Sequence, residues 1–430
     1  MTIGRTPTIF REGLWVGISQ AAAAIAALAG VRILTSLMSP EQYGQLTLLL
    51  GIVALSFNLL ISPVLQATLR FFPVSAEVGQ VHFLRGVSSG WVLRGLFAGT
   101  ALLLLGGVLW QALGHPDPTL LTVGLACTLL AADALRTFEL GLLNASRRQR
   151  DYSLRNALDA WARPLAASLA IFTLGPTAMS VLLGYTAGSL GVSGLLRRRV
   201  VKHGEAAERP DADTWKPTFR RDFLQYAFPL VPYALLQWTM SLSDRYFLAG
   251  FEGTVSVGLY AAAYGLGSQP FIAANTFVHS VLRPVLYDAV AQGDRAKERK
   301  TLALWLAAVV IISGAGVGLF VLFSNPIAHW LLGQDFWGSA QLLPWIAGAY
   351  ALQSVQQTFE IVLYAHGRTR QVVWVQGIAA AVSLLLYVLL IPRFGAWGAA
   401  LGTLGTFFIT AIVSAALARA CLRHENPDSA

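Results

Sequence analysis

Apolar stretches of about 20 residues follow one another along almost the whole chain of 430 residues. At a rise of about 1.5 Å per residue, a helix of that length crosses the hydrocarbon core of a bilayer. Charged residues make up 12% of the chain, whereas soluble domains contain roughly 25%. So few charges cannot cover a water-facing surface. The sequence therefore predicts an all-α integral membrane protein.

Turn signals divide these stretches into about twelve predicted transmembrane helices. Proline and glycine occur at the breaks, for example at Ser39-Pro40 and Gly175-Pro176, where a continuous helix is disfavoured. The first span is long enough to cross the membrane and has no cleavage site after it, so we expect it to be retained. The predicted spans are residues 12–37, 43–69, 84–110, 118–144, 155–174, 178–196, 222–248, 255–282, 301–323, 339–365, 371–391 and 396–418.

Basic residues divide the connecting loops into two sets. One set holds most of the Lys and Arg, including eight between Arg197 and Arg221, and the alternate set holds Arg393 alone. Lys and Arg accumulate in cytoplasmic loops, so the first set is predicted to be cytoplasmic, and twelve spans then place both termini there. The net charge of +9 therefore reflects membrane topology, and we expect no nucleic-acid partner.

One long polar stretch, residues 197–221, lies near the middle of the chain. We expect it to be a cytoplasmic linker between an N-terminal six-helix lobe at 1–196 and a C-terminal six-helix lobe at 222–421. Residues 422–430 then form a cytoplasmic tail. The outer loops are mostly a few residues long, so we expect no outer catalytic domain.

Landmark residues recur at a fixed spacing in the two halves, which indicates an internal repeat. Arg32 in the first span and Arg245 in the seventh are 213 residues apart, as are Arg70 and Arg283 at the ends of the second and eighth spans. The tripeptide Thr-Phe-Glu of the fourth span recurs in the tenth, 221 residues later. Because each half has an even number of spans, the lobes are predicted to be parallel repeats around a central cavity.

Several charged residues fall inside the predicted spans, where an Arg costs roughly 2.5–3.5 kcal/mol to insert. Asp133, Arg136 and Glu139 follow one another at helical spacing on one face of the fourth span. Such residues fit salt bridges that fix helices together. They also fit an acid that couples proton movement to transport, and this role is open to Glu360 as well.

Four arginines are candidate anion-binding groups. No acid lies within one helical turn of Arg32, and the acid that directly precedes Arg245 does not face it on a helix. Arg70 and Arg283 also lack an acid within one turn on the membrane side, although they could instead snorkel to the cytoplasmic interface. The planar fork of a guanidinium group matches phosphate oxygens, so these four side chains are predicted to bind an anionic substrate.

Two polar residues accompany the second pair of arginines. Gln66 and His279 lie four residues before Arg70 and Arg283, respectively, on the same helix faces. They are candidate cavity residues, and the alternative is that they form hydrogen bonds between helices.

The sequence contains no pattern typical of a catalytic, metal or cofactor site. Cys127 and Cys421 lie far apart in apolar segments and are expected to be small buried hydrophobes. The chain has no Cys/His cluster with ligand spacing, no nucleophile–base constellation and no phosphate-binding glycine loop. We therefore expect no enzyme activity, no metal and no cofactor.

Three segments resemble the polysaccharide flippases of the Wzx type, a branch of the multidrug/oligosaccharidyl-lipid/polysaccharide exporter (MOP) superfamily. The resemblance covers nearly the whole chain and includes the count of twelve spans. The segments are Arg32-Ile33-Leu34 with Ser39-Pro40-Glu41-Gln42-Tyr43-Gly44, then Asp244-Arg245-Tyr246-Phe247-Leu248 with Val257-Gly258-Leu259-Tyr260-Ala261-Ala262-Ala263-Tyr264, and Leu390-Ile391-Pro392-Arg393-Phe394-Gly395-Ala396-Trp397-Gly398-Ala399-Ala400.

The resemblance implies the fold of MATE multidrug exporters and lipid II flippases. It also implies a substrate made of undecaprenyl pyrophosphate carrying an oligosaccharide, such as an O-antigen, capsule or exopolysaccharide repeat unit, in the bacterial inner membrane. Arg32 and Arg245, together with Arg70 and Arg283, would then hold the pyrophosphate while the lipid tail stays in the bilayer. A polysaccharide polymerase complex is an implied partner.

Two other functions remain open at this point. A MATE-like multidrug exporter shares the fold, but cationic substrates would favour an acid-rich cavity. A membrane polysaccharide polymerase or glycosyltransferase would need larger outer loops that carry catalytic residues.

Overall fold

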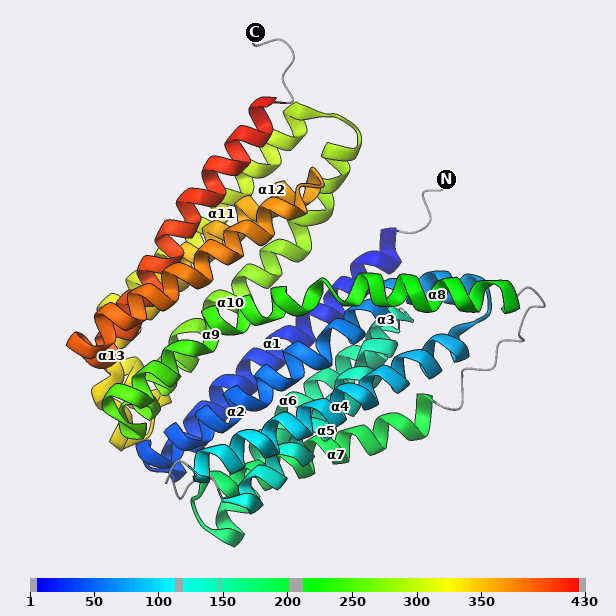
Figure 1. The fold of residues 1–430 in the computed structure, drawn as a ribbon. Helices are drawn as coiled ribbons and strands as arrows, with labels where there is room; N and C mark the ends of the chain where they lie inside the picture. The colour runs from blue at the N-terminus through cyan, green and yellow to red at the C-terminus, as the bar shows by residue number, and fades with distance from the viewer. Residues whose placement is uncertain (1–5, 113–118, 147, 201–211, 425–430) are drawn as a thin grey trace. The chain divides into compact units, whose positions relative to one another are not determined.

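The computed structural model describes residues 6–112, 119–146, 148–200 and 212–424, and every regular element in these ranges is a helix (Figure 1). This confirms the predicted all-α fold. The helices are α1 (Thr6–Leu37), α2 (Pro40–Leu60), α3 (Ser62–Glu77), α4 (Val81–Ala112), α5 (Leu120–Ala145), α6 (Gln149–Leu174), α7 (Ala178–Val200), α8 (Ala212–Ala227), α9 (Leu230–Glu252), α10 (Thr254–Ala291), α11 (Arg295–Leu331), the 3₁₀ helix η2 (Gln334–Leu342), α12 (Leu343–Ala365) and α13 (Thr369–His424).

Two predicted spans are each interrupted at or just before a proline. The span 43–69 is divided between α2 and α3 at Ile61, and Pro63 lies in the first turn of α3. The span 222–248 is divided between α8 and α9, and Pro229 lies in the break. Proline has no backbone N–H to continue the helical hydrogen bonds, and it disfavours helical geometry in the residue before it.

The spans predicted at 371–391 and 396–418 run together as the two limbs of α13. Gly395 lies between them with φ 54° and ψ −129°, a left-handed conformation that favours glycine. The hydroxyl of Tyr387 in one limb lies 3.1 Å from that of Thr403 in the other, so the chain reverses with almost no loop. Six helices of the described part are long and apolar enough to cross a membrane by length and composition.

The chain forms two compact units, which differ in their boundaries from the predicted lobes. The first unit contains Met1–Ala26 and Leu46–Trp238, and the second contains Ala27–Gln45 and Thr239–Ala430. Part of the predicted linker is helical, since α7 continues to Val200 and α8 begins at Ala212. The other linker residues, 201–211, and residues 425–430 of the predicted tail lie outside the described residues.

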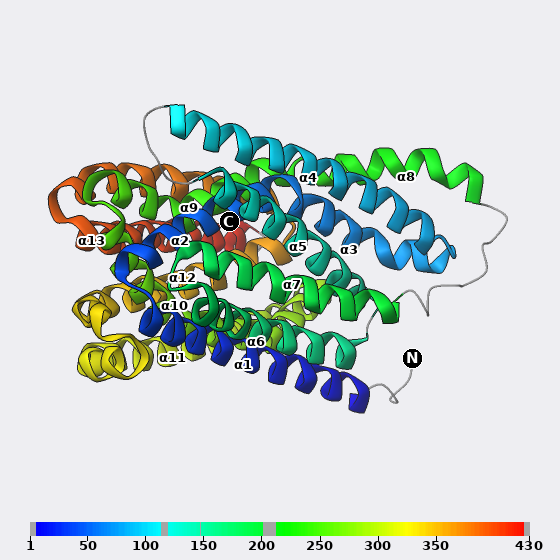
Figure 2. The same cartoon turned by 90° about the horizontal axis from the view of Figure 1, so that it is seen from below.

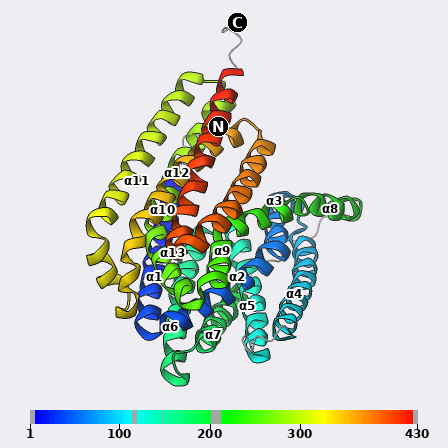
Figure 3. The same ribbon diagram turned by 60° about the vertical axis from the view of Figure 1, so that its left-hand side comes forward.

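In the first unit, α7 packs against α5 and α6, while α8 lies along α3 (Figures 2 and 3). The contact between α8 and α3 is aromatic. Phe71 of α3 meets Phe219 and Phe223 of α8, with ring centroids 5.4 and 6.1 Å apart. Both side chains from α8 are buried, so this helix of the linker region is part of the first unit.

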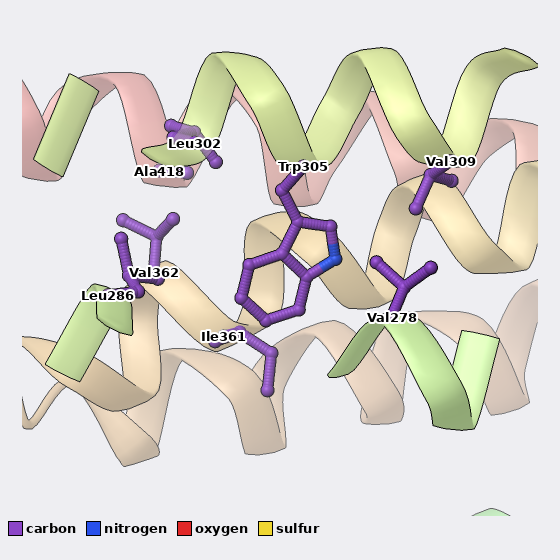
Figure 4. Close-up of a cluster of buried hydrophobic side chains, with 8 residues drawn as sticks. All are labelled: Val278, Leu286, Leu302, Trp305, Val309, Ile361, Val362 and Ala418. Atoms are coloured by element: carbon purple, nitrogen blue, oxygen red, sulfur yellow. The ribbon is translucent and has the colours of Figure 1, made fainter. Parts of the chain in front are cut away.

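In the second unit, α12 packs against α10, α11 and α13. Trp305 of α11 is completely buried among apolar side chains from these four helices (Figure 4). The buried members of this cluster are Val278, Leu286, Leu302, Trp305, Val309, Ile361, Val362 and Ala418.

Segment 27–45 belongs to the second unit because α2 approaches α10 at two glycines. A Cβ atom at Gly44 would collide with the backbone oxygen of Thr254, and one at Gly258 would collide with that of Pro40. Both glycines occur in the motifs that resemble the flippases. The close approach of the two backbones explains why side chains are absent there.

We predict that Gly258→Ala destabilises the protein, because the added methyl group meets a backbone oxygen that cannot move away. Overpacking of this kind costs about 1–3 kcal/mol. Thermal unfolding of the detergent-solubilised protein should show a lower midpoint. Gly250→Ala in α9 is the matched control, since a Cβ there meets nothing within 4 Å. Equal midpoints for the two variants would contradict the packing described here.

Candidate functional site

Arg245 of α9 is buried in the second unit, with 9% of its surface exposed. Its guanidinium lies over the ring of Tyr264, 4.8 Å from the centroid, and its Nη1 is 3.5 Å from the backbone oxygen of Ser241. Its Nε is buried and has no hydrogen-bond partner among the described atoms. No carboxylate of the described residues forms an ion pair with it. A buried cation with so few partners is costly.

The neighbouring acid, Asp244, has other partners. Its Oδ2 accepts a hydrogen bond of 2.7 Å from the hydroxyl of Tyr260, and its Oδ1 accepts one of 2.8 Å from the backbone N–H of Arg245. The Tyr260 hydroxyl also lies 3.4 Å from Thr403 Oγ1. These bonds fix the carboxylate in place.

Four tyrosines from three helices surround this pair, and we call Tyr260, Tyr264, Tyr350 and Tyr387 the tyrosine cluster. Tyr264 and Tyr350 share a hydrogen bond of 2.7 Å between their hydroxyls, and the rings of Tyr260 and Tyr264 lie 5.7 Å apart. All four are buried. The cluster therefore places the Tyr264 hydroxyl, which accepts from Tyr350 and keeps its own hydrogen, beside a guanidinium whose Nε is unpartnered among the described atoms. Both groups can donate hydrogen bonds to an anion.

Sequence analysis missed most of this cluster. Tyr260 and Tyr264 stand one helical turn apart in a motif already noted, but Tyr350 and Tyr387 carry no local signal. Their partners lie on other helices, 86 residues away for Tyr350 and Tyr264. A tyrosine within an apolar span gives no indication of which distant residue it will contact.

Arg32 lies in the second unit as well, at a different place. Its Nη1 donates to the backbone oxygen of Leu332, the C-cap residue that follows α11. Beside it, the N–H of Gly333 donates to the hydroxyl of Thr35 over 3.0 Å. A cation at a helix C-terminus is stabilised by the free carbonyl groups there. In the described residues no contact joins Arg32 to Arg245.

The second predicted pair of arginines is exposed. Arg70 and Gln66 lie on α3 in the first unit, whereas Arg283 lies on α10 in the second, and all three are exposed. The structure therefore does not gather the four predicted cations within one unit. The convergence of guanidinium groups on a shared cavity stays a prediction.

His279 is half-buried against the apolar cluster of Figure 4. Its ring meets that of Trp305 edge to face, with centroids 5.0 Å apart, and its Nε2 has no partner among the described atoms. One turn earlier, Asn275 donates a hydrogen bond of 2.5 Å to Gln357. This face of α10 is thus joined to α11 and α12.

Four charged residues of the first unit compensate one another. Arg136 lies 2.5 Å from Asp159 and 3.6 Å from Asp133, and Asp133 also pairs with Arg163. Ser189 of α7 lies 3.1 Å from Asp133. This network of two acids and two bases joins α5, α6 and α7, and its formal charge is zero.

Glu139 and Glu360, the acids of the repeated tripeptide, have different partners. Glu139 pairs with Arg85 of α4 over 2.6 Å. Glu360 accepts hydrogen bonds of 2.9 Å from the amides of Gln356 and Gln376. In the described residues no group of His, Cys, Asp and Glu could hold a metal ion.

Comparison with known proteins identifies a family and a fold. The model of the family described as "Polysaccharide biosynthesis protein" matches residues 9–290. No curated protein sequence matches the chain significantly.

Several solved structures are similar over nearly the whole chain. An inward-facing multidrug resistance MATE family transporter of the MOP superfamily has a TM-score of 0.73, with 16% identity over 97% of this chain and 99% of that one. The lipid II flippase MurJ, in an inward closed conformation, has a TM-score of 0.72, with 16% identity over 94% of this chain and 87% of that one. A MOP superfamily transporter from Pyrococcus furiosus, whose reverse polarity of binding pocket suggests a different function, has a TM-score of 0.64, with 15% identity over 96% and 95%.

These likenesses show the fold, and they confirm the predicted MATE-like class. The proteins are transporters or flippases by their descriptions, so the chain has the fold of a multi-pass membrane transporter.

We predict that Arg136→Leu destabilises the first unit strongly, because Asp159 then remains buried without its cation. Removing one partner of a buried ion pair costs about 3–5 kcal/mol. Lys297→Leu is the control, since it removes a pair with Asp288 in which both side chains are exposed, and such pairs contribute about 0–1 kcal/mol. Thermal midpoints in detergent should separate the two variants, and similar midpoints would contradict the role of the network.

Proposed function

Because the chain belongs to the family of polysaccharide biosynthesis proteins, we propose that it is a Wzx-type flippase for undecaprenyl-pyrophosphate-linked oligosaccharide. It carries the lipid-linked repeat unit of an O-antigen, capsule or exopolysaccharide from the cytoplasmic to the periplasmic leaflet of the bacterial inner membrane. Alternating access moves the headgroup, while the lipid tail stays in the bilayer. Both termini of the chain are cytoplasmic in this proposal, and a polysaccharide polymerase is its partner.

The observation that carries the proposal is the state of Arg245. Its guanidinium is buried without a carboxylate within ion-pair distance, and its Nε is unpartnered. The pyrophosphate of the substrate supplies oxygen acceptors for the guanidinium, which the neighbouring Asp244 does not supply because its oxygens accept from Tyr260 and from the backbone N–H of Arg245. Charge-assisted hydrogen bonds between arginine and phosphate are stronger than neutral ones, and in a region of low dielectric they are stronger still. The hydroxyl of Tyr264 accepts from Tyr350 and keeps its own hydrogen as a further donor beside the guanidinium.

The other predicted cations have subordinate roles in this proposal. Arg32 donates to the end of α11 and keeps further N–H groups for a ligand. Arg70 and Arg283 are exposed, so they attract the headgroup rather than enclose it.

A multidrug exporter is the second candidate, since a MATE transporter has the same fold. Its cationic substrates would require a free acid at the binding centre, whereas Asp244 beside Arg245 is held by hydrogen bonds from Tyr260 and from the backbone. An unpaired buried arginine opposes a cation by like-charge repulsion, so we favour the flippase. A drug-efflux assay in cells that produce the protein discriminates between the two functions, and resistance to cationic drugs would overturn our choice.

We predict that Arg245→Gln lowers the rate of flipping about tenfold or more, because a hydrogen bond to a charged group contributes about 1.5–3 kcal/mol. The measurement is transport of a labelled undecaprenyl-pyrophosphate-linked repeat unit into inverted membrane vesicles. Arg299→Gln is the matched control, since this arginine is exposed on α11 and should leave transport unchanged. Wild-type rates in the Arg245→Gln vesicles would remove the basis of the proposed binding centre.

A further inference from the structure

Glu360 of α12 is a buried acid without a cation. It lies in the span predicted at residues 339–365, and 6% of its surface is exposed. Its Oε1 accepts two hydrogen bonds of 2.9 Å, from Gln356 Nε2 and Gln376 Nε2. No Arg, Lys or His of the described residues forms an ion pair with it. Two neutral amides compensate a carboxylate only in part, so its charge remains costly in this place.

The corresponding acid of the first unit serves as an internal comparison. Glu139 ends the same tripeptide and is similarly buried, with 8% of its surface exposed. It has a guanidinium partner, Arg85, at 2.6 Å. A permanent cation at this distance compensates the negative charge of a carboxylate. Glu360 lacks such a cation, so it is free to change its charge.

The amides around Glu360 favour a proton over a metal cation. Gln356 Oε1 accepts a hydrogen bond of 2.7 Å from Thr410, which turns the NH₂ group of this amide toward Glu360. Hard cations bind oxygen atoms, and the two N–H groups at Oε1 would repel them. Gln376 Oε1 is buried and has no partner in the described structure. The amide that donates to Glu360 thus also holds a vacant acceptor, which suits the O–H of a protonated carboxyl.

The other titratable groups on the helices around α12 are engaged elsewhere or exposed. Glu298 of α11 lies 2.8 Å from His366, and His279 of α10 lies against the Trp305 ring. Arg283 of α10 is exposed, and Cys421 of α13 lies in an apolar cluster. The groups in direct contact with the Glu360 carboxylate are the two amides.

We propose that Glu360 is the proton-binding site that couples flipping to the proton gradient, an inference that rests on the proposed function. A proton from water on one side of the membrane adds to the carboxylate and gives a neutral carboxyl. The carboxyl later returns the proton to water on the other side, so no other reactant is needed. Because the charged and neutral forms differ in the cost of burial, proton binding favours one conformation of the protein over another.

Infrared difference spectra of the purified full-length protein test the site without any substrate. As the pH is lowered, the C=O stretching band of a protonated carboxyl should appear in the wild-type protein. It should be lost in Glu360→Gln, whose side-chain oxygen still accepts from both amides and so preserves the fold. Glu139→Gln should retain the band. An identical band in wild-type and Glu360→Gln proteins would overturn the proposal.

Transport in proteoliposomes tests the coupling. With labelled lipid-linked repeat unit, an imposed proton gradient should accelerate wild-type flipping, and Glu360→Gln should lose this acceleration while flipping down the gradient of the lipid itself continues. Acceleration of Glu360→Gln by the proton gradient, or by a sodium gradient instead, would overturn the coupling role. If the wild-type protein flipped no lipid at all, the proposed function would fail, whereas the infrared result would still decide whether Glu360 binds a proton.

Discussion

The bilayer cannot solvate charges, so each ionised side chain in a span must find its partner inside the protein. The first unit meets much of this requirement in one network, where Asp133, Arg136, Asp159 and Arg163 cancel one another's formal charge, although Arg136 Nε and Asp159 Oδ1 have no hydrogen-bond partner among the described atoms. The second unit does not. The guanidinium of Arg245 lies over the ring of Tyr264 and is 3.5 Å from the backbone oxygen of Ser241. Its Nε has no hydrogen-bond partner among the described atoms.

This difference in charge compensation affects how the buried charged groups of each unit respond to rearrangement and to a ligand. A charge-balanced network resists rearrangement, because breaking it exposes buried ions. A cation and an acid that lack full compensation gain stability from whatever supplies the missing charge. An anionic headgroup does this for Arg245 and a proton does it for Glu360, and both residues lie in the second unit. The two proposals therefore rest on the same physical argument. A buried charge that the protein does not fully compensate has affinity for a ligand that compensates it, here an anionic headgroup or a proton.

Local patterns predicted the helices well and their interruptions less well. Hydropathy is a property of neighbouring residues, so it marks an apolar stretch wherever it occurs. It does not show that Pro63 divides one span into α2 and α3, or that the chain reverses at Gly395 with almost no loop between the two limbs of α13. For the site, the sequence predicted that Arg245 is under-neutralised, because adjacent residues such as Asp244 do not face each other on a helix and this spacing is local information. It gave no indication of the tyrosine cluster, which three different helices build.

The sequence by itself determined that the chain is helical and lies in a membrane, because both follow from the length and spacing of apolar runs. It also identified which charges lack a partner within one helical turn. Only the tertiary structure decided which partners they have, since those lie far away along the chain. Arg136 reaches an acid 23 residues away, and Arg32 reaches a carbonyl group 300 residues away. Such contacts depend on how helices pack, which no window of neighbouring residues contains.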